Sequence, residues 1–208
     1  MRILLVAATT FEVDLFLKNK ENIEVLISGL GTPVTIYALT KKILENTYDI
    51  IIQAGIAGTF SKKIKKGQVV LVKQDAFADI GVEEKGTYKT MYQLGFGDEN
   101  EFPFSKGWLV NSNKILHTTH LKVVKGVTVN RLSDRKKQTL QLLKVFNADV
   151  ESMEGAALHY VCLQMNIPFL QMRSISNKVG ERNKNKWKIK EAVDNLTSEL
   201  LKLAQTLS

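Results

Sequence analysis

The chain has 208 residues, of which 44% are hydrophobic and 24% charged, a composition typical of one soluble globular domain with a substantial core. We therefore expect a single domain over residues 1–208. No apolar run approaches the roughly 18 to 20 residues that a membrane-spanning helix needs. The net charge is +8, but the basic residues are scattered, so we expect no nucleic-acid partner and no membrane partner.

The sequence shows no sign of a metal or cofactor site. His117 and His120 are three residues apart without a third ligand nearby, so we expect no metal. No glycine turn has the spacing of a dinucleotide fingerprint or a Walker loop, so we expect no cofactor. The single cysteine, Cys162, lies in a helical apolar pattern, which predicts a core thiol and a cytoplasmic, reducing compartment.

Apolar, β-branched runs alternate with helix-like segments along most of the chain. We expect strands over residues 3–8, 23–28, 48–54, 68–73, 123–129 and 167–173. Helical spacing predicts a helix with Thr32 as N-cap and Pro33 in its first turn, and further helices over residues 133–146, 152–165 and 187–207. Such alternation predicts an α/β sandwich.

Residues 77–108 interrupt this pattern. The segment is rich in glycine, acidic and aromatic residues and has little periodicity, and a long irregular insert in a compact domain is usually functional or disordered. Its aromatic residues argue against disorder. We therefore expect it to cover the substrate or to contact another subunit.

Three segments place polar residues or tight turns after predicted strands, where open α/β sheets bind their ligands. Glu12 follows the first strand at the start of a helix, where the helix dipole stabilises a carboxylate. The glycine-rich "QAGIAGTF" at residues 53–60 exposes backbone amides to a ligand. The third segment places Met153 and Glu154 before a buried helix and "RSISN" after the next strand.

"SMEGAA" at residues 152–157, followed by "RSISN" at residues 173–177, resembles the signature of the purine nucleoside phosphorylase and nucleosidase superfamily. The similarity extends, in the same order, to "FEV" after the first strand, "SGLGTPVTIYAL" and "QAGIAGTF". It implies a three-layer sandwich with a central mixed twisted sheet flanked by helices. It also implies a small-molecule purine nucleoside as substrate, and a homodimer or higher homo-oligomer whose neighbours complete the 5′ pocket.

The resemblance implies a role for each matching residue at the sugar. Glu154 is expected to bind the ribose hydroxyls, with Met153 against the sugar and with Ala57 and Gly58 contacting the substrate. Glu12 stands where related nucleosidases hold the carboxylate that orients and deprotonates water. Because two like charges about 4 Å apart repel by roughly 4 kcal/mol at an effective dielectric near 20, this carboxylate disfavours phosphate, and we expect water as the nucleophile.

At the base, Asn177 departs from the relatives that act on adenine nucleosides, which carry aspartate there. Its amide can accept a bond from N7–H and donate one to O6, which fits a 6-oxopurine and rejects the amino group of adenine. Ser176 is expected to form hydrogen bonds near the base, and residues 130–133, Asn130 included, to lie beside it. Arg173 is expected to orient the water or the nearby carboxylates.

A hydrolytic carboxylate combined with a 6-oxopurine resembles the futalosine hydrolase family, and "DIGVE" and "FPF" in the insert are similar to its pattern. The resemblance implies hydrolysis of the N-glycosidic bond of futalosine, with release of hypoxanthine and dehypoxanthine futalosine, in menaquinone biosynthesis. Arg182 and Lys85 are the candidates to pair with the carboxylate on the 5′ side. Whether Glu151 contacts the sugar stays open, because Ser152 separates it from Met153.

Three other functions remain open at this point. A methylthioadenosine/S-adenosylhomocysteine nucleosidase would require Asn177 to replace the usual aspartate. A purine nucleoside phosphorylase would depend on phosphate and release ribose 1-phosphate. A nucleoside-binding or nucleic-acid-binding module without catalysis would use the positive charge and would tolerate substitution of Glu12 and Glu154.

Overall fold

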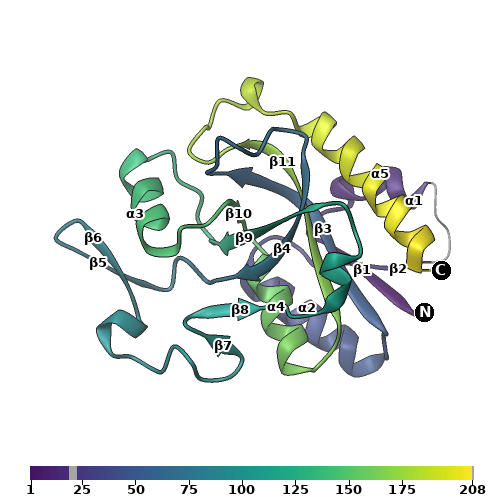
Figure 1. Ribbon diagram of the computed structural model, residues 1–208, viewed down its shortest axis with the longest axis horizontal. Coiled ribbons are helices and arrows are strands. Elements are labelled where there is room, and N and C mark those ends of the chain that lie inside the picture. The colour runs from purple at the N-terminus through teal and green to yellow at the C-terminus, as the bar shows by residue number, and fades with distance from the viewer. Residues whose placement is uncertain (19–22, 208) are drawn as a thin grey trace.

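Nine strands form one mixed sheet in the computed structural model, which describes residues 1–18 and 23–207 (Figure 1). The strands of this sheet are β1 (Ile3–Ala7), β2 (Glu24–Ile27), β3 (Ile50–Thr59), β4 (Val69–Asp75), β7 (Phe104–Ser105), β8 (Trp108–Val110), β9 (Lys122–Thr128), β10 (Val150–Ser152) and β11 (Phe169–Lys178). A separate hairpin consists of β5 (Gly81–Glu84) and β6 (Thr87–Thr90). The helices are α1 (Asp14–Leu17), α2 (Thr32–Glu45), α3 (Lys136–Phe146), α4 (Gly155–Gln164) and α5 (Ile189–Leu207), and the short 3-10 turns are η1 (Thr10–Glu12), η2 (Tyr92–Leu94), η3 (Lys114–His117) and η4 (Lys184–Lys186).

The sheet closes on itself. β3 pairs with β11 over nearly its whole length and with β10 at its end, β10 pairs with β9, β9 with β4, and β4 with β11. The predicted α/β class with a central mixed sheet and flanking helices is confirmed, but the expected plain three-layer sandwich is wrong. The reason is that β3 and β11 are each 10 residues long, so strand twist accumulates along them until their far ends reach partners outside a flat sheet.

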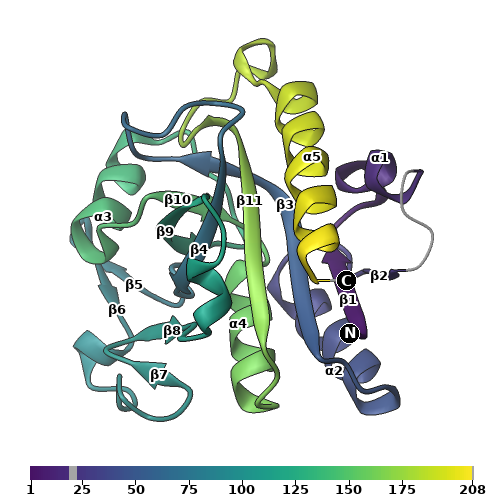
Figure 2. The ribbon, with the colours of Figure 1, turned by 45° about the vertical axis from the view of Figure 1, so that its right-hand side comes forward.

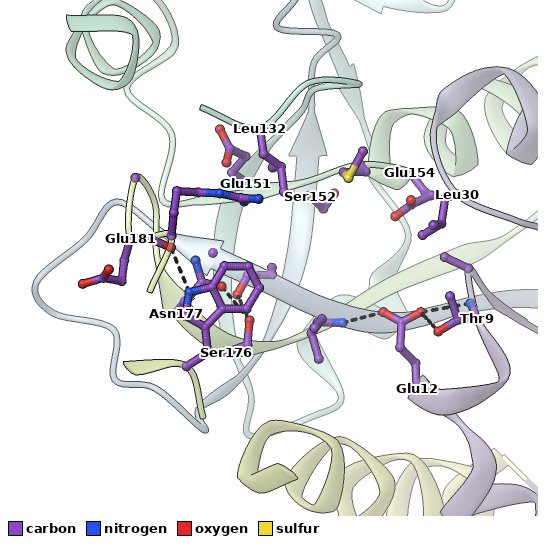
Figure 3. Close-up of a pocket in the computed structure, with 18 of the residues that line it drawn as sticks. Thr9, Glu12, Leu30, Leu132, Glu151, Ser152, Glu154, Ser176, Asn177 and Glu181 are labelled. Carbon is purple, nitrogen blue, oxygen red and sulfur yellow. Dashed lines mark hydrogen bonds between the residues drawn. The ribbon is translucent and has the colours of Figure 1, made fainter. Parts of the chain in front are cut away.

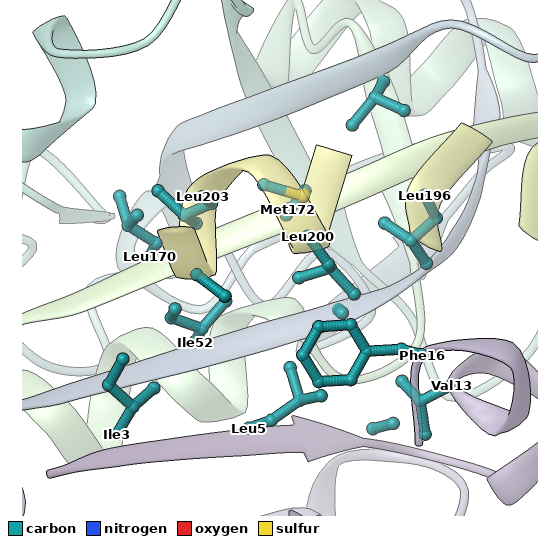
Figure 4. Close-up of a cluster of buried hydrophobic side chains, with 14 of the residues drawn as sticks. Ile3, Leu5, Val13, Phe16, Ile52, Leu170, Met172, Leu196, Leu200 and Leu203 are labelled. Atoms are coloured by element: carbon teal, nitrogen blue, oxygen red, sulfur yellow. The ribbon is translucent and has the colours of Figure 1, made fainter. Parts of the chain in front are cut away.

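Side chains alternate between two apolar layers on either side of β1. Ile3, Leu5 and Ala7 belong to one buried cluster, and Leu4 and Val6 belong to another, because successive residues of a strand point to opposite faces. The first cluster packs under α5 and α1 (Figure 4). The second packs against α2 and α4, which lie on the other side of the sheet (Figure 2). No helix within the described ranges, α5 included, is both long and apolar enough to cross a membrane.

Most elements lie close to their predicted positions, and the differences are local. Thr32, the expected N-cap, is the first residue of α2, and Gly31 is the N-cap. The helix expected over residues 133–146 begins only at Lys136. β10 was not among the predicted strands, because a strand of three residues is too short to produce a periodic pattern.

Residues 77–108 form ordered structure rather than an irregular loop. The β5–β6 hairpin projects away from the main sheet (Figure 1). β7 and β8 belong to the main sheet and form one of its edges. A cluster of aromatic rings packs where the segment meets the rest of the fold. Phe104 lies against Phe77, Tyr92 and Tyr160 with ring centroids 6.0 to 6.5 Å apart. Part of the aromatic content of the insert therefore packs internally and against Tyr160 of α4, whereas Phe96 and Phe102 are exposed.

Candidate active site

A cavity of about 230 Å³ brings the predicted catalytic segments together. Its walls come from the segments 8–12, 56–58, 132–133, 151–154 and 176–187, with Leu30 at its rim. Figure 3 shows Glu12 and Glu154 toward one end of the cavity, and Asn177 and Glu151 toward the other. The cavity is thus polar at both ends, and the segment 151–154 contributes a carboxylate to each of them.

Glu12 is held in place by backbone amides and a hydroxyl. It is the last residue of η1 and is only 7% exposed. Its Oε1 accepts a hydrogen bond from the Ile56 backbone N–H at 3.0 Å, and Oε2 accepts from the N–H and the hydroxyl of Thr9 at 3.1 and 3.2 Å. The Thr9 contacts form a capping box. The carboxylate is therefore fixed in orientation, and its remaining lone pairs are available to a ligand.

Arg173 lies behind the wall of the cavity and not among the residues that line it. Its side chain is 1% exposed, and Nη2 donates to Gln53 Oε1 at 2.6 Å. The guanidinium and the Glu12 carboxylate both approach Gly55, where a Cβ would lie 2.7 Å from Glu12 Oε1 and would also collide with Arg173 Nη1. Glycine at this position therefore allows a buried positive charge to stand close to the carboxylates of Glu12 and Glu154.

The local structure around α4 explains why the Glu154 side chain is free for the cavity. Glu154 is the N-cap residue of α4, yet its side chain forms no cap hydrogen bond. Two hydroxyls take over that role: Ser152 Oγ accepts from the Gly155 N–H at 3.2 Å, and Thr128 Oγ1 accepts from the Ala156 N–H at 2.7 Å. Because the helix end is already satisfied, the Glu154 carboxylate does not have to turn toward it.

The Glu154 carboxylate instead lines the cavity and contacts the backbone of Gly31. Its Oε1 accepts from the Gly31 N–H at 2.9 Å, and the side chain is 5% exposed. Burial raises the pKa of Glu154, while the charge of Arg173 and the Gly31 amide oppose that shift. Met153 also lines the cavity. This arrangement leaves a carboxylate oxygen and an apolar side chain facing the cavity.

The orientation of the Asn177 amide is set by its neighbours. Nδ2 donates to the Lys178 carbonyl at 2.8 Å, and Oδ1 accepts from Ser176 Oγ at 2.7 Å. Since a carbonyl can only accept, the first bond distinguishes Nδ2 from Oδ1. Each amide atom keeps one further bonding direction. Asn177, Ser176, Ala57 and Gly58 all line the cavity, so these predicted residues lie together.

Asn130 lies outside the cavity lining, although we expected it beside the base. Its Oδ1 accepts from the Thr32 N–H at 2.9 Å, and its backbone N–H donates to Asp79 at 2.5 Å. Asn130 therefore satisfies a free amide at the start of α2. Its neighbours Leu132 and Ser133 line the cavity, so the predicted segment is present with different residues facing inward.

Glu151 and Arg182, to which the sequence assigned no definite contact with the sugar or the base, also line the cavity. Glu151 is 7% exposed, and burial raises its pKa to about 7, while the charge of Arg182 opposes the shift. Arg182 also lines the cavity, with its guanidinium 5.7 Å from the centre of the Trp187 ring. Lys85, the other candidate for the 5′ side, lies in the turn between β5 and β6 and does not line the cavity.

Comparison with known proteins places this geometry in a family. The model of the phosphorylase superfamily matches residues 5–208. The chain belongs to the phosphorylase superfamily. Among its relatives, a futalosine hydrolase from Thermus thermophilus is 29% identical over 86% of this chain and 79% of its own length. A futalosine hydrolase from Streptomyces coelicolor is 31% identical over 77% of this chain and 67% of its own length.

Solved structures of the superfamily share the fold. A 5′-methylthioadenosine/S-adenosylhomocysteine nucleosidase from Neisseria meningitidis, in complex with methylthio-immucillin-A, has a TM-score of 0.80. Its sequence is 18% identical, and the match covers 99% of this chain and 100% of that chain. At this identity the similarity concerns the fold alone.

The charges that line the cavity of this phosphorylase-superfamily chain favour a neutral nucleophile over an anionic one. Glu12, Glu151, Glu154 and Glu181 line it, whereas Arg182 is the one Lys or Arg among the described lining residues. A cavity with this excess of carboxylates repels a phosphate dianion and accepts neutral water. In the described part of the chain, no three His, Cys, Asp or Glu side chains converge as a metal site.

Proposed function

We propose that this protein hydrolyses the N-glycosidic bond of futalosine, releasing hypoxanthine and dehypoxanthine futalosine, a reaction of menaquinone biosynthesis. Similarity to two relatives named futalosine hydrolase supports the substrate. The observation that carries the reaction type is the Glu12 carboxylate, held by Ile56 and Thr9 at the sugar end of a cavity with an excess of carboxylates. A group held in this way can orient water and take its proton.

In the proposed reaction, the oxygen of water attacks C1′ of the ribose while the bond from C1′ to N9 of the purine breaks. The bonding electron pair leaves with the purine, and Glu12 accepts the proton that water loses. The purine takes up a proton at N7 from solvent, because the Asn177 amide is too weak an acid to supply one. Asn177 then holds the N7–H with Oδ1 and the O6 atom with Nδ2.

Glu154 acts on the sugar side of the same bond. Its carboxylate accepts hydrogen bonds from the ribose hydroxyls and stabilises the positive charge that develops on the ring as the bond breaks. Arg173 is a positioning residue in this scheme, since it lies behind the wall, bonded to Gln53. Its charge favours the ionised form of Glu154, which is the form that binds hydroxyls as an acceptor.

The test is an assay of the purified protein with futalosine in phosphate-free buffer, followed by chromatography of the bases. We expect hypoxanthine release at a rate that added phosphate does not increase. Absence of hypoxanthine release refutes the proposal. Release that depends on phosphate and yields a sugar 1-phosphate indicates a phosphorylase, and adenine release from methylthioadenosine at a comparable rate indicates the adenine-type nucleosidase.

Asn177→Asp is expected to change the base preference toward adenine. A carboxyl group at this position can protonate N7 and accept a bond from the adenine amino group, whereas it repels O6. We expect the ratio of kcat/KM for futalosine over its 6-amino analogue to fall at least about tenfold, because hydrogen bonds to charged groups are worth about 1.5 to 3 kcal/mol. An unchanged ratio would remove Asn177 from base recognition.

We propose further that the working form is a homodimer. An exposed apolar surface runs from η1 along α2, and its members are Phe11, Leu30, Val34, Tyr37 and Leu44. Phe11 and Leu30 of this surface also line the cavity, so a second copy seated there would both bury apolar area and close the side of the cavity beside the sugar.

Light scattering during gel filtration should give twice the chain mass at micromolar concentration, and Tyr37→Glu should give a monomer with weaker substrate binding. A monomeric wild type with full activity contradicts this.

A further inference from the structure

Three residues from three neighbouring strands form a row across the sheet at the end of the cavity away from Glu12. In β3, Gly58 lies opposite Asn177 of β11 on one side and opposite Glu151 of β10 on the other. Residues directly opposite one another in a sheet point to the same face. Asn177 and Glu151 therefore stand on one face, two strands apart, with Gly58 between them.

Gly58 keeps the space between the two side chains open. A Cβ there would lie 3.0 Å from Val179 Cγ2 and 3.4 Å from Asn177 Nδ2, so a larger residue would fill the gap and press on the amide. Two strand spacings are about 9 to 10 Å. A flat purine with hydrogen bonds of about 2.9 Å at two opposite edges spans a comparable width. The spacing of the three strands is therefore compatible with a base that lies between polar groups on the two outer strands.

The Glu151 carboxylate has no hydrogen-bond role within the protein. Although it is only 7% exposed, none of the hydrogen bonds or ion pairs formed among residues 1–18 and 23–207 includes its oxygens. Glu12 and Glu154, by contrast, each accept bonds from backbone amides. Its oxygens are not among the fully buried polar atoms that lack a partner in the described ranges. They are therefore accessible from the cavity that Glu151 lines and can accept a hydrogen bond from a ligand there.

We propose that Glu151 is a specificity-determining residue that accepts a hydrogen bond from N1–H of the 6-oxopurine, at the edge opposite Asn177. This inference rests on the proposed function, because it assigns a second contact to the same base. A 6-oxopurine presents a donor at N1, whereas adenine presents a lone pair there, which a carboxylate repels. In this proposal Glu151 binds N1–H and Asn177 binds N7–H and O6, so the two side chains contact both edges at which hypoxanthine differs from adenine.

The electrostatic surroundings of Glu151 are consistent with an acceptor that works at neutral pH. Burial raises its pKa to about 7, and Arg182, which lines the same cavity, favours the ionised form. On its other side Glu151 borders an adjoining cavity, where Asp79, Glu83 and Arg131 are the charged neighbours. Ionised Glu151 accepts from N1–H, and protonated Glu151 can donate to N1 of adenine.

The experiment measures binding of free bases by calorimetry, so that it does not depend on turnover of futalosine. Wild type should bind hypoxanthine at least about tenfold more tightly than 1-methylhypoxanthine, because the methyl group removes the donor that Glu151 accepts. In Glu151→Ala this ratio should fall to near one. Glu151→Gln, which keeps one acceptor oxygen without the charge, should be intermediate. Glu83→Gln, an exposed carboxylate beside the adjoining cavity, should retain the wild-type ratio.

A second readout is the preference for hypoxanthine over adenine as pH changes. The preference should increase as pH rises from about 6 to about 8, through the raised pKa of Glu151 of about 7, and should be independent of pH in Glu151→Gln. An equal ratio of hypoxanthine to 1-methylhypoxanthine affinity in wild type and Glu151→Ala overturns the inference, even if futalosine is hydrolysed. A different outcome is that futalosine is not hydrolysed but the ratio of hypoxanthine to 1-methylhypoxanthine affinity still depends on Glu151. In that case the proposed reaction is wrong, whereas the proposed contact of Glu151 with the base is supported.

Discussion

Replacing Glu12 with glutamine should lower kcat for hypoxanthine release at least about a hundredfold, because general-base catalysis typically contributes a factor of roughly 10² to 10⁴. Glutamine keeps an oxygen that can accept the Ile56 N–H bond but cannot take a proton from water. Substrate binding should change little, since the base and the ribose hydroxyls are bound elsewhere. Steady-state assays with futalosine, which separate kcat from KM, test this prediction.

Asp14→Asn is a matched control for Glu12→Gln. Asp14 is two residues away, and its carboxylate forms an ion pair with Lys18 at 2.6 Å with the Asp14 side chain 48% exposed. Exposed pairs of this kind contribute about 0 to 1 kcal/mol to stability, so this variant should keep wild-type kcat. If Glu12→Gln retains more than about a tenth of the wild-type kcat, Glu12 is not the group that activates water, and the hydrolytic assignment loses its main support.

Replacing Glu154 with glutamine should lower kcat/KM by about a hundredfold or more, because the lost charge stabilises the developing positive charge on the ribose and accepts its hydroxyls. Unlike Glu12→Gln, this change should also raise KM. The Gly31 N–H, which donates to Glu154 Oε1 at 2.9 Å, keeps an oxygen partner in the variant, so the fold around α4 should persist. Thermal unfolding by circular dichroism verifies that it does.

A 2′-deoxy analogue of futalosine distinguishes hydroxyl binding from a general loss of activity. If Glu154 binds that hydroxyl, Glu154→Gln should cost much less with the deoxy analogue than with futalosine, because the contact is already absent. Glu45→Gln at the exposed end of α2 is the control and should leave both substrates unaffected. Equal losses with the two substrates would show that Glu154 acts on something other than this hydroxyl.

The candidate site was predictable from sequence where a residue belongs to a motif of fixed local geometry. Glu12, Met153, Glu154, Ser176 and Asn177 were named from short motifs, and the structure brings all five to one cavity. Glu12 lies in the turn after β1, Met153 and Glu154 directly follow β10, and the other two lie near the end of β11. The ends of neighbouring strands converge at one edge of a sheet.

Other residues could not be placed from their neighbours in sequence. Arg173 belongs to a matching motif, yet strand alternation turns its side chain behind the wall toward Gln53. Asn130 was expected at the base, but it satisfies an amide of α2, nearly a hundred residues away in the chain. In both cases the partner comes from a distant element, and local spacing contains no information on that partner.

Outside residues 77–108, and apart from β10, the sequence alone determined the order and approximate limits of the strands and of the four longer helices, since hydrophobic periodicity and turn residues act within a few residues of one another. It also determined which carboxylates and amides follow those strands. Only the tertiary structure decided that the sheet closes into a barrel-like ring and that Glu151 and Asn177 flank Gly58 on neighbouring strands. Strand pairing and twist are non-local, because each depends on which distant strand a given edge meets, and a short strand such as β10 is defined by its partners rather than by its own three residues.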